Sequence, residues 1–272
     1  MLVFTINKQE SIMKNSIKLT GLVICLFVTA SINAQRTINA SDIMKDVKSG
    51  KNITYNNVTI VGDLDFTFMD EKLDKLPKRK RFWNNNSSNK IEELVTGKVS
   101  FKNCTFQDNV FAYIHHEDSG YTFVANFDDT VVFKNCTFKE ESQFKYSNFR
   151  TNADFSDSKF NGDSSFKYAK FKRDISFTNT VFGEESTFKY AEFSNHVSFA
   201  NAVFKESATF KYSKFKDGVS FRKVRFEEDL NIKYTKVSGK FDISGMHVAY
   251  DIDSKYTKIN GSSFSKHLIN KN

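Results

Sequence analysis

The sequence is poor in residues that often carry chemistry. Its 272 residues include one proline, three cysteines and five histidines. Three cysteines allow at most one intramolecular disulfide. No histidine lies in a recognisable metal or nucleophile motif, so no histidine-based catalytic centre is expected. The most apolar segment, Leu22–Ala30, is shorter than the ~20 residues of a membrane-spanning helix.

That apolar segment is instead typical of a secretory signal peptide. Lys14 and Lys18 precede it as a positive n-region, and Ala34 offers a small residue for cleavage. Met13 is a suitable start, because the preceding polar stretch adds nothing that such a signal needs. We therefore predict residues 1–34 as a signal peptide and expect an exported protein in the periplasm, on the outer surface or secreted.

Export changes how the charge and the cysteines are interpreted. The formal charge is +8, and residues 1–34 carry three lysines and one glutamate, so the mature chain would carry +6. A basic exported chain can meet glycans, lipid head groups or proteins, whereas its location argues against nucleic acid. A lipid anchor on Cys25 is a weaker alternative, because Ile24 is bulky for the residue before a lipidated cysteine.

Phenylalanine is abundant, with 30 copies, and it recurs with a regular rhythm. Steps of five and six residues alternate without a slip through positions 133, 138, 144, 149, 155, 160, 166, 171, 177, 182, 188, 193, 199, 204, 210, 215, 221 and 226. The same rhythm continues through Ile232, Val237, Ile243, Val248, Ser254 and Ile259. The chain is therefore a repeat protein, and its C-terminal part continues the same fold.

A second restricted position lies two residues before each of these centres, and it is almost always small or β-branched. Examples are Cys136, Ala153, Ser164, Ile175 and Val197. Residues two apart point to the same side of an extended backbone, so the large and the small residue share an apolar inner edge. Neither a helical period nor one long strand would keep this pattern in register.

These features resemble the pentapeptide-repeat family, over roughly residues 52–69 and 99–259. The resemblance implies a right-handed, four-sided β-helix of the all-β class. The sequence departs from the usual family pattern in two ways. Phenylalanine replaces the commoner leucine at the centre, and the alternation of five- and six-residue steps gives a 22-residue coil.

A 22-residue period is also visible in a second pattern. Phe-Lys-Tyr recurs at 144–146, 166–168, 188–190 and 210–212, and Lys-Tyr follows at 233–234 and 255–256. If this period makes one coil, these pairs stack on one face at ~4.8 Å intervals. Isolated coils should not fold, because each needs its neighbours.

Upstream, Ile53, Val58, Leu64 and Met69 fit the same rhythm as centres. The segments 99–106 and 131–138 are nearly identical in sequence, and the distance between them along the chain is ten residues longer than one coil. We therefore predict a β-helix over 52–259 with insertions near 70–98 and 107–130. We also expect an N-terminal segment 35–51 with a short capping helix over 41–48, its N-cap at Ser41, and a C-terminal tail over 260–272.

The Lys-Tyr stripe is the main candidate for a binding surface. A row of aromatic rings on a rigid face can stack sugars, while lysines and neighbouring acidic residues hold hydroxyl or anionic groups. The alternative is structural, because stacked tyrosines with lysine stems along them stabilise a face by themselves. The candidate residues are Tyr146, Tyr168, Tyr190, Tyr212, Tyr234, Lys167, Lys189 and Lys211.

Three other features are weaker. His115 and His116 precede two acidic residues without metal-ligand spacing, which favours a solvated loop. The basic and aromatic run 78–83 suits an anionic lipid or polysaccharide surface, or is a solvated loop. Cys104 and Cys136 share an inward position one coil apart, so they either form a disulfide or are two small core residues.

The sequence thus favours a non-catalytic exported scaffold for binding or protein interaction, with no cofactor and no metal. Carboxylates recur with the repeat, as an exposed ladder would, whereas an active site should occur once. A carbohydrate-active β-helix enzyme or a glycan-binding module is the alternative. The partner can be a glycan, an anionic lipid surface or a protein, and oligomers can form through the solenoid ends.

Overall fold

The structure is a computed structural model that describes residues 35–77 and 89–269. All its helices and strands belong to the unit that begins at Arg36. The predicted signal peptide, residues 1–34, lies outside the described residues and stays a prediction. The whole basic and aromatic run, residues 78–83, also lies outside the described residues and stays a prediction.

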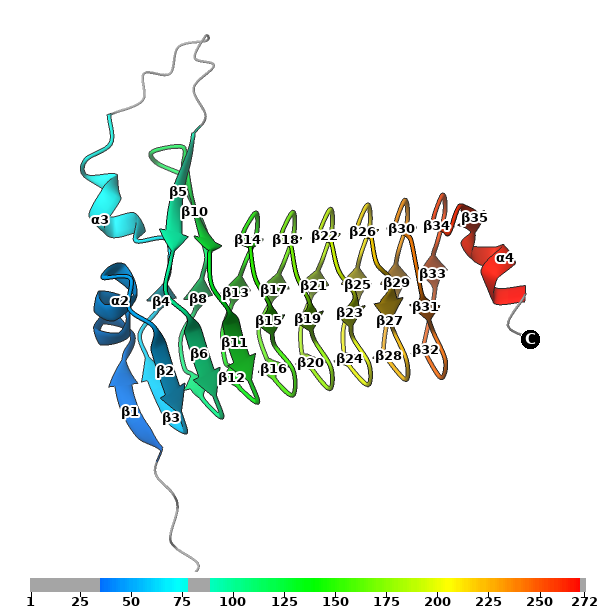
Figure 1. Cartoon of the computed structure of the whole chain (residues 1–272), viewed down its shortest axis with the longest axis horizontal. Coiled ribbons are helices and arrows are strands. Elements are labelled where there is room, and N and C mark those ends of the chain that lie inside the picture. The colour runs from blue at the N-terminus through cyan, green and yellow to red at the C-terminus, as the bar shows by residue number, and fades with distance from the viewer. Residues whose placement is uncertain (1–34, 78–88, 270–272) are drawn as a thin grey trace, which may run out of the picture. The chain divides into compact units, whose positions relative to one another are not determined.

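The chain coils around four faces, each a sheet of mostly parallel strands (Figure 1). Face A contains β1 (Arg36–Asn39), β3 (Val58–Val61), β7 (Thr105–Phe106), β12 (Thr137–Phe138), β16 (Lys159–Phe160), β20 (Val181–Phe182), β24 (Val203–Phe204), β28 (Arg225–Phe226) and β32 (His247–Val248). Face B contains β2 (Ile53–Asn56), β6 (Val99–Lys102), β11 (Val131–Lys134), β15 (Ala153–Asp154), β19 (Ile175–Ser176), β23 (Val197–Ser198), β27 (Val219–Ser220) and β31 (Phe241–Asp242).

The other two faces complete each coil. Face C contains β4 (Leu64–Asp65), β8 (Val110–Phe111), β13 (Ser142–Gln143), β17 (Ser164–Ser165), β21 (Ser186–Thr187), β25 (Ala208–Thr209), β29 (Leu230–Asn231) and β33 (Ile252–Asp253). Face D contains β5 (Lys90–Val95), β10 (Tyr121–Phe127), β14 (Asn148–Phe149), β18 (Lys170–Phe171), β22 (Glu192–Phe193), β26 (Lys214–Phe215), β30 (Lys236–Val237), β34 (Lys258–Ile259) and β35 (Ser262–Ser263).

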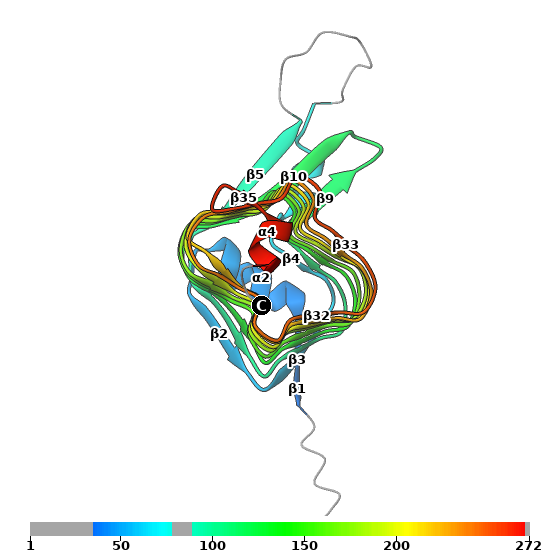
Figure 2. The ribbon, with the colours of Figure 1, turned by 90° about the vertical axis from the view of Figure 1, so that its right-hand side faces the viewer.

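The register confirms the 22-residue coil. Ser164 pairs with Ser186, and Phe171 pairs with Phe193, in parallel ladders. Figure 2 looks along the axis from the C-terminal end. There the chain passes from β2 through β3 and β4 to β10 counterclockwise while it advances toward the viewer, so the coil is right-handed. The expected four-sided β-helix is confirmed.

Stacked phenylalanine rings fill the interior. Phe166, Phe188 and Phe210 are fully buried, and the centroids of consecutive rings are 5.0 and 4.9 Å apart. Rings from the opposite faces B and C meet edge to face, as Phe166 and Phe177 do at 5.2 Å. Both geometries suit the aromatic quadrupole. Burying one phenylalanine contributes roughly 1.5–3 kcal/mol, which is the main stabilisation of each coil.

The alternation of five and six residues reflects two kinds of corner. Most corners after faces B and C are tight turns closed by one hydrogen bond, such as that from the Ala191 amide to the Phe188 carbonyl (2.9 Å). The third residue of each such turn has a positive φ, for example 62° at Tyr190 and 59° at Asn179. Corners after faces A and D contain one more residue, which accounts for the longer step.

The N-terminal end is covered as expected, with one difference. Helix α2 (Ala40–Lys48) buries Ala40, Ile43, Met44 and Val47 against the first coil. It begins one residue before the predicted start, with Asn39 rather than Ser41 at the N-cap, and Asn39 makes no side-chain capping bond. The preceding strand β1 pairs with β3 and already fixes the chain there, so a polar cap is not required.

The predicted centres of the first coil are wrong by two residues. Ile53 pairs with Val99 and Tyr55 with Phe101, so Ile53 occupies the small inward position and Tyr55 the centre. Leu64 likewise pairs with Val110 rather than with a centre, and Met69 begins helix α3 (Met69–Leu73). Both inward columns follow the same five-six rhythm, so spacing alone does not distinguish them where large apolar residues such as Ile53 and Leu64 occupy the column that is small elsewhere.

The two insertions form one projection beside face D. Strand β9 (Tyr113–His116) pairs antiparallel with β10, and β10 pairs parallel with β5 along its whole length. The second insertion is narrower than predicted, because Val110 and Phe111 already belong to face C and Phe127 stacks on Phe149 in face D. The extra residues therefore build a hairpin without interrupting the core.

The C-terminal segment is more ordered than the predicted tail. Strand β35 pairs antiparallel with β34, and Phe264, at the start of helix α4 (Phe264–Ile269), is buried against Phe241. Within the described residues, β31, β32 and β33 are the last strands of faces B, A and C. Association through the solenoid ends stays a prediction. None of the described helices is both long and apolar enough to cross a bilayer.

Candidate binding surface

The predicted Lys-Tyr stripe forms a continuous ladder at the corner between faces C and D. Consecutive rings from Tyr146 to Tyr234 have centroids 4.6–4.7 Å apart and lie within 3° of parallel. Tyr256 extends the stack at 4.9 Å. Tyr113, from the β9 hairpin, approaches the other end at 5.9 Å with a tilt of 41°. All five predicted tyrosines are therefore brought together, and we call this stack the tyrosine ladder.

The backbone at the ladder is unfavourable for tyrosine. Each ladder tyrosine from Tyr146 to Tyr256 has a φ between 60° and 64°. This left-handed region costs a residue other than glycine roughly 1–2 kcal/mol, and asparagine or aspartate enters it more readily than a bulky side chain does. Tyrosine at successive corners therefore indicates that the stacked rings offset the strain, serve a surface role, or both.

The stack limits what the rings can offer a ligand. In the interior of the ladder each ring is covered on both faces by its neighbours, so Tyr168, Tyr190 and Tyr212 present edges and hydroxyl groups. Only a terminal ring such as Tyr256, which is 57% exposed, has a free face. The expected stacking of sugars on a flat aromatic row is therefore restricted to the ends of the ladder.

The ladder lysines lie beside the rings. The Nζ atoms of Lys145, Lys167, Lys189, Lys211, Lys233 and Lys255 are 5.1–5.9 Å from the centroid of the following tyrosine. The distance is within the range of cation–π attraction, but that attraction needs an open ring face and so applies only at the ends of the ladder. The pKa of Lys167 is lowered, first because burial disfavours its charge and then because Lys145 and Lys189 repel it. Burial also raises the pKa of Tyr168.

A groove runs along the face D side of the tyrosine ladder. It has a volume of about 340 Å³ and is lined by Lys90, Tyr146, Asn148, Tyr168, Lys170, Tyr190, Glu192, Tyr212 and Lys214. One wall is the edge of the ladder, and the other is the outward column of β14, β18, β22 and β26. The predicted Lys167, Lys189 and Lys211 are not among the lining residues.

The second wall of the groove combines amide and charged groups. Glu192 accepts hydrogen bonds from Lys214 (2.8 Å) and Lys216 (3.3 Å), and the bond from Lys214 is the main reason why the pKa of Glu192 is lowered. Asn148 donates to Asn126 at 2.8 Å. Lys170 has no ion pair among the described residues. The groove is therefore cationic, with its single carboxylate already neutralised.

The sequence-based interpretation missed this second wall. Asn148, Lys170, Glu192 and Lys214 recur at the 22-residue period, two residues after each ladder tyrosine. The available signal was this spacing, since both positions lie outside the core on adjacent faces. It was not decisive, because only the turn geometry shows that the two columns border one groove.

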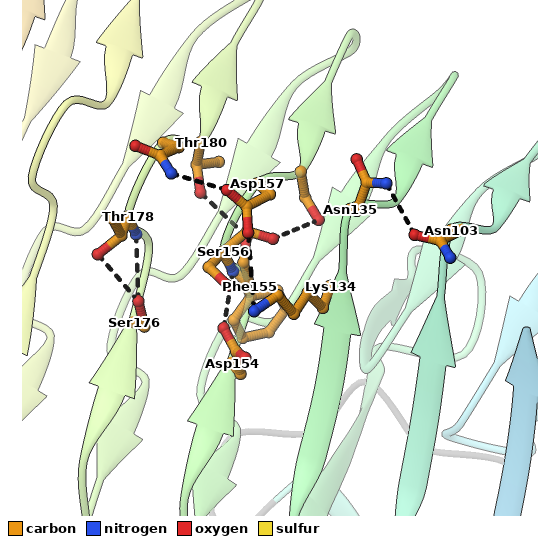
Figure 3. Close-up of polar contacts among 12 residues, drawn as sticks. Asn103, Lys134, Asn135, Asp154, Phe155, Ser156, Asp157, Ser176, Thr178 and Thr180 are labelled. Atoms are coloured by element: carbon orange, nitrogen blue, oxygen red, sulfur yellow. Dashed lines mark hydrogen bonds and ion pairs between the residues drawn. The ribbon is translucent and has the colours of Figure 1, made fainter.

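The same kind of turn after face B has different side chains (Figure 3). Its left-handed position is occupied by Asn57, Asn103, Asn135, Asp157, Asn179 and Asn201, and then by Lys223 and Gly245. We call the run from Asn103 to Asn201 the asparagine corner. The side-chain amide of Asn135 donates a hydrogen bond to Asn103 (2.7 Å), and that of Asn179 donates to Asp157 (2.7 Å), along the solenoid. These bonds satisfy neighbouring polar groups along the solenoid.

The two cysteines are free and buried in the structure. Cys104 and Cys136 follow Asn103 and Asn135, and their sulfurs approach the carbonyls of Lys102 (3.2 Å) and Lys134 (3.4 Å). Burial raises the pKa of the Cys136 thiol. The structure thus places both as small core residues, which was one of the two alternatives, rather than as a disulfide.

The adjacent histidines lie on the β9 hairpin. His115 is exposed and its Nδ1 is 2.9 Å from Thr122 Oγ1, whereas His116 Nδ1 is 3.0 Å from Ser119 Oγ. Within residues 35–77 and 89–269, no three side chains of metal-ligand type come close enough to hold an ion. The pair therefore lies at the end of strand β9 in a hydrogen-bonded hairpin, rather than in the predicted loop.

Comparison with known proteins agrees with this geometry. The family model described as pentapeptide repeats matches nine copies over residues 125–170 and 188–236. These ranges coincide with the coils whose phenylalanines stack in the core. The chain is a pentapeptide-repeat protein. No curated protein and no solved structure matches it.

Membership in the family explains the architecture, whereas the function depends on the surface residues. A pentapeptide-repeat protein is a structural repeat scaffold whose coils fix a shape. Its function depends on the outward residues, which vary freely without disturbing the core. In this pentapeptide-repeat protein, the tyrosine ladder and its groove are the most distinctive outward feature.

Proposed function

We propose that this pentapeptide-repeat protein is an exported, non-catalytic scaffold that binds an extended acidic glycan in the groove beside the tyrosine ladder. The observation that carries the proposal is the lining of the groove, in which tyrosine edges face a cationic wall. Tyrosine hydroxyl groups both donate and accept hydrogen bonds, and lysines attract carboxylate or sulfate groups. The predicted signal peptide favours a ligand outside the cytoplasm.

The shape of the groove favours a linear ligand. Four coils contribute a tyrosine to it, so it extends for roughly 14 Å along the axis at ~4.8 Å per coil. Tyrosines that repeat at one spacing suit a polymer with repeated units. The single carboxylate of the groove, Glu192, is held by Lys214 and Lys216 rather than paired with a second acid, which favours binding over catalysis.

Retention on immobilised polysaccharide tests the proposal. We expect the purified protein to be retained by polygalacturonate more strongly than by neutral dextran, and to be released by salt because exposed charges are screened. The triple variant Tyr168→Ala, Tyr190→Ala, Tyr212→Ala should lose most of this retention. The double variant Lys170→Gln, Lys214→Gln should weaken it in low salt only.

A matched control is Tyr250→Ala. Tyr250 is 73% exposed and lies outside the groove, so its loss should leave retention unchanged. Far-UV circular dichroism and thermal melting of every variant report folding. Retention of the triple tyrosine variant at the level of the parent protein would contradict the proposal. Mass spectrometry of the exported protein tests cleavage before Gln35.

A further inference from the structure

Face C presents three straight columns of outward residues. Across each coil, alternating side chains face outward, so residues two apart share the surface. The first column contains Glu141, Asp163, Glu185, Ser207, Asp229 and Asp251, and we call it the acidic column. The central column contains Gln143, Ser165, Thr187, Thr209, Asn231 and Asp253, and the lysine column contains Lys145, Lys167, Lys189, Lys211, Lys233 and Lys255.

Backbone hydrogen bonds align these columns between coils. The amide of Ser164 donates to the carbonyl of Glu185 (3.0 Å), and the amide of Tyr168 donates to the carbonyl of Lys189 (2.9 Å). Thr187 pairs with Ser165 and Thr209 in the face C ladder. Like residues therefore repeat at ~4.8 Å along the axis.

Side-chain contacts show that both outer columns belong to this face. Gln143 donates to Glu141 across it at 3.4 Å, and Lys233 Nζ lies 3.7 Å from Asp253 in the central column. All members of the acidic column are exposed. Face C is therefore negative along one edge, largely neutral in the middle and positive along the other edge.

The two charged columns are too far apart to neutralise each other within one molecule. Glu185 and Lys189 are separated by roughly 13 Å of extended chain. In the part of the chain that the structure describes, Asp163, Glu185, Lys167, Lys189 and Lys211 form no ion pair. Each column instead stacks like charges on neighbouring strands, which is unfavourable in an isolated molecule.

A second copy can neutralise the charges of both columns in only one of the two possible two-fold symmetric orientations, parallel or antiparallel. When the two-fold axis runs parallel to the solenoid, the acidic column of the second copy faces the lysine column of the first, and the reverse holds at the other edge. A two-fold axis across the face places acid on acid and lysine on lysine. We propose that face C is the interface of a parallel, two-fold symmetric homodimer.

The dimer should be weak and sensitive to salt. Six coils give a patch roughly 30 Å by 15 Å, so about 900 Å² would be buried in total, at the low end of specific interfaces. The central column is small and polar, and so allows close approach without a large apolar contribution. The groove lies on the far side of the tyrosine rings and stays open in this arrangement.

Charge reversal tests the interface. We expect analytical ultracentrifugation of the parent protein in about 20 mM salt to show dimers that dissociate in about 500 mM salt. The variant Lys167→Glu, Lys189→Glu, Lys211→Glu should raise the dimer dissociation constant about tenfold or more. The variant Asp163→Lys, Glu185→Lys, Asp229→Lys should do the same. A mixture of the two variants should form a heterodimer. One copy then carries two acidic columns and the other two basic columns, so opposite charges meet at both edges of the interface.

Cross-linking tests the parallel orientation. Ser165→Cys, Thr187→Cys and Thr209→Cys each place a thiol on the two-fold axis, so a short bis-maleimide should join each residue to its own copy. An antiparallel dimer would cross-link only one of the three positions in this way. The parent protein, treated in the same way, is the control for cross-linking through Cys104 and Cys136, which are both buried.

The proposal is overturned by a parent protein that stays monomeric at high concentration in low salt. It is equally overturned by charge-reversed variants that dimerise as the parent does, or by a mixture that does not associate. Circular dichroism checks that the variants fold, and the acidic-column variant alone decides the question if the lysine-column variant does not fold. Glycan retention by the acidic-column variant should be unchanged, because none of its substitutions lies in the groove.

Discussion

The tyrosine ladder and the asparagine corner share one backbone turn and differ in every outward property. Both close with the same kind of hydrogen bond and hold their third residue in the left-handed region. At the asparagine corner the side chain suits this conformation and bonds along the axis. At the tyrosine ladder the side chain is disfavoured by the backbone but stacks and borders a groove. The difference indicates that surface chemistry, rather than turn geometry, selects tyrosine.

The largest effect should come from the core on which both corners depend. Phe188 contacts Phe166, Phe177, Phe199 and Phe210, so Phe188→Ala removes contacts below both corners. We expect a loss of about 3–5 kcal/mol in the free energy of unfolding, measured by urea denaturation. Phe188→Leu should lose clearly less. A loss below about 1 kcal/mol for Phe188→Ala, no more than an average substitution costs, would show that the rings are not the common support.

The asparagine corner should be sensitive to loss of its amide. Asn179 donates to Asp157 (2.7 Å) and accepts from Asn201 (2.9 Å). Asn179→Ala removes both bonds and places alanine at a positive φ, so we expect a loss of roughly 1–2 kcal/mol in unfolding free energy. Asn179→Gly keeps the conformation accessible and should lose less. Equal losses for the two variants would mean that the left-handed turn contributes nothing.

The tyrosine ladder should tolerate the replacement of a tyrosine by asparagine. Tyr190→Asn loses ring stacking but relieves the backbone strain, so the unfolding free energy should change by less than about 1 kcal/mol. Thermal and urea unfolding measure the change. A loss clearly larger than this would assign the ladder a mainly structural role, and would weaken the argument that tyrosine is selected for binding.

The smallest effect should be a dependence on pH beside the ladder. The pKa of Glu192 is lowered in the folded protein, first by the hydrogen bond from Lys214. Its contribution is therefore present above the pKa of the unfolded chain, which is about 4.5, and is lost as the pH falls through the folded value. The partners are partly exposed, so we expect a few tenths of a kcal/mol.

Glu192→Gln is the comparison for this pH effect. Unfolding free energies of the parent and of Glu192→Gln, measured between pH 6 and pH 3, should converge as the pH falls. Parallel curves across that range would show that the ion pairs with Lys214 and Lys216 add nothing to stability.

Much of the fold could be predicted because one residue type, phenylalanine, fills most of the core at a regular spacing. Phe133 to Phe226 kept the rhythm, and the structure confirms the 22-residue coil and the stacking of Tyr146 to Tyr234. The first coil was predicted two residues out of register, because Ile53 and Tyr55 both point inward and only strand pairing separates them. The insertion boundaries failed for a related reason, since Phe111 and Phe127 fit either a coil or a loop.

The sequence by itself determined the repeat, the coil length and which residues face the core, because a periodic apolar pattern can be buried in only one way. The tertiary structure decided what the outward residues do together. It stacked the tyrosine rings so that their edges face outward, joined them to Lys170 and Lys214 across a corner, and separated the acidic and lysine columns by the width of face C. Periodicity fixes the position of a residue along a coil, but the turn angle at each corner fixes which columns become neighbours.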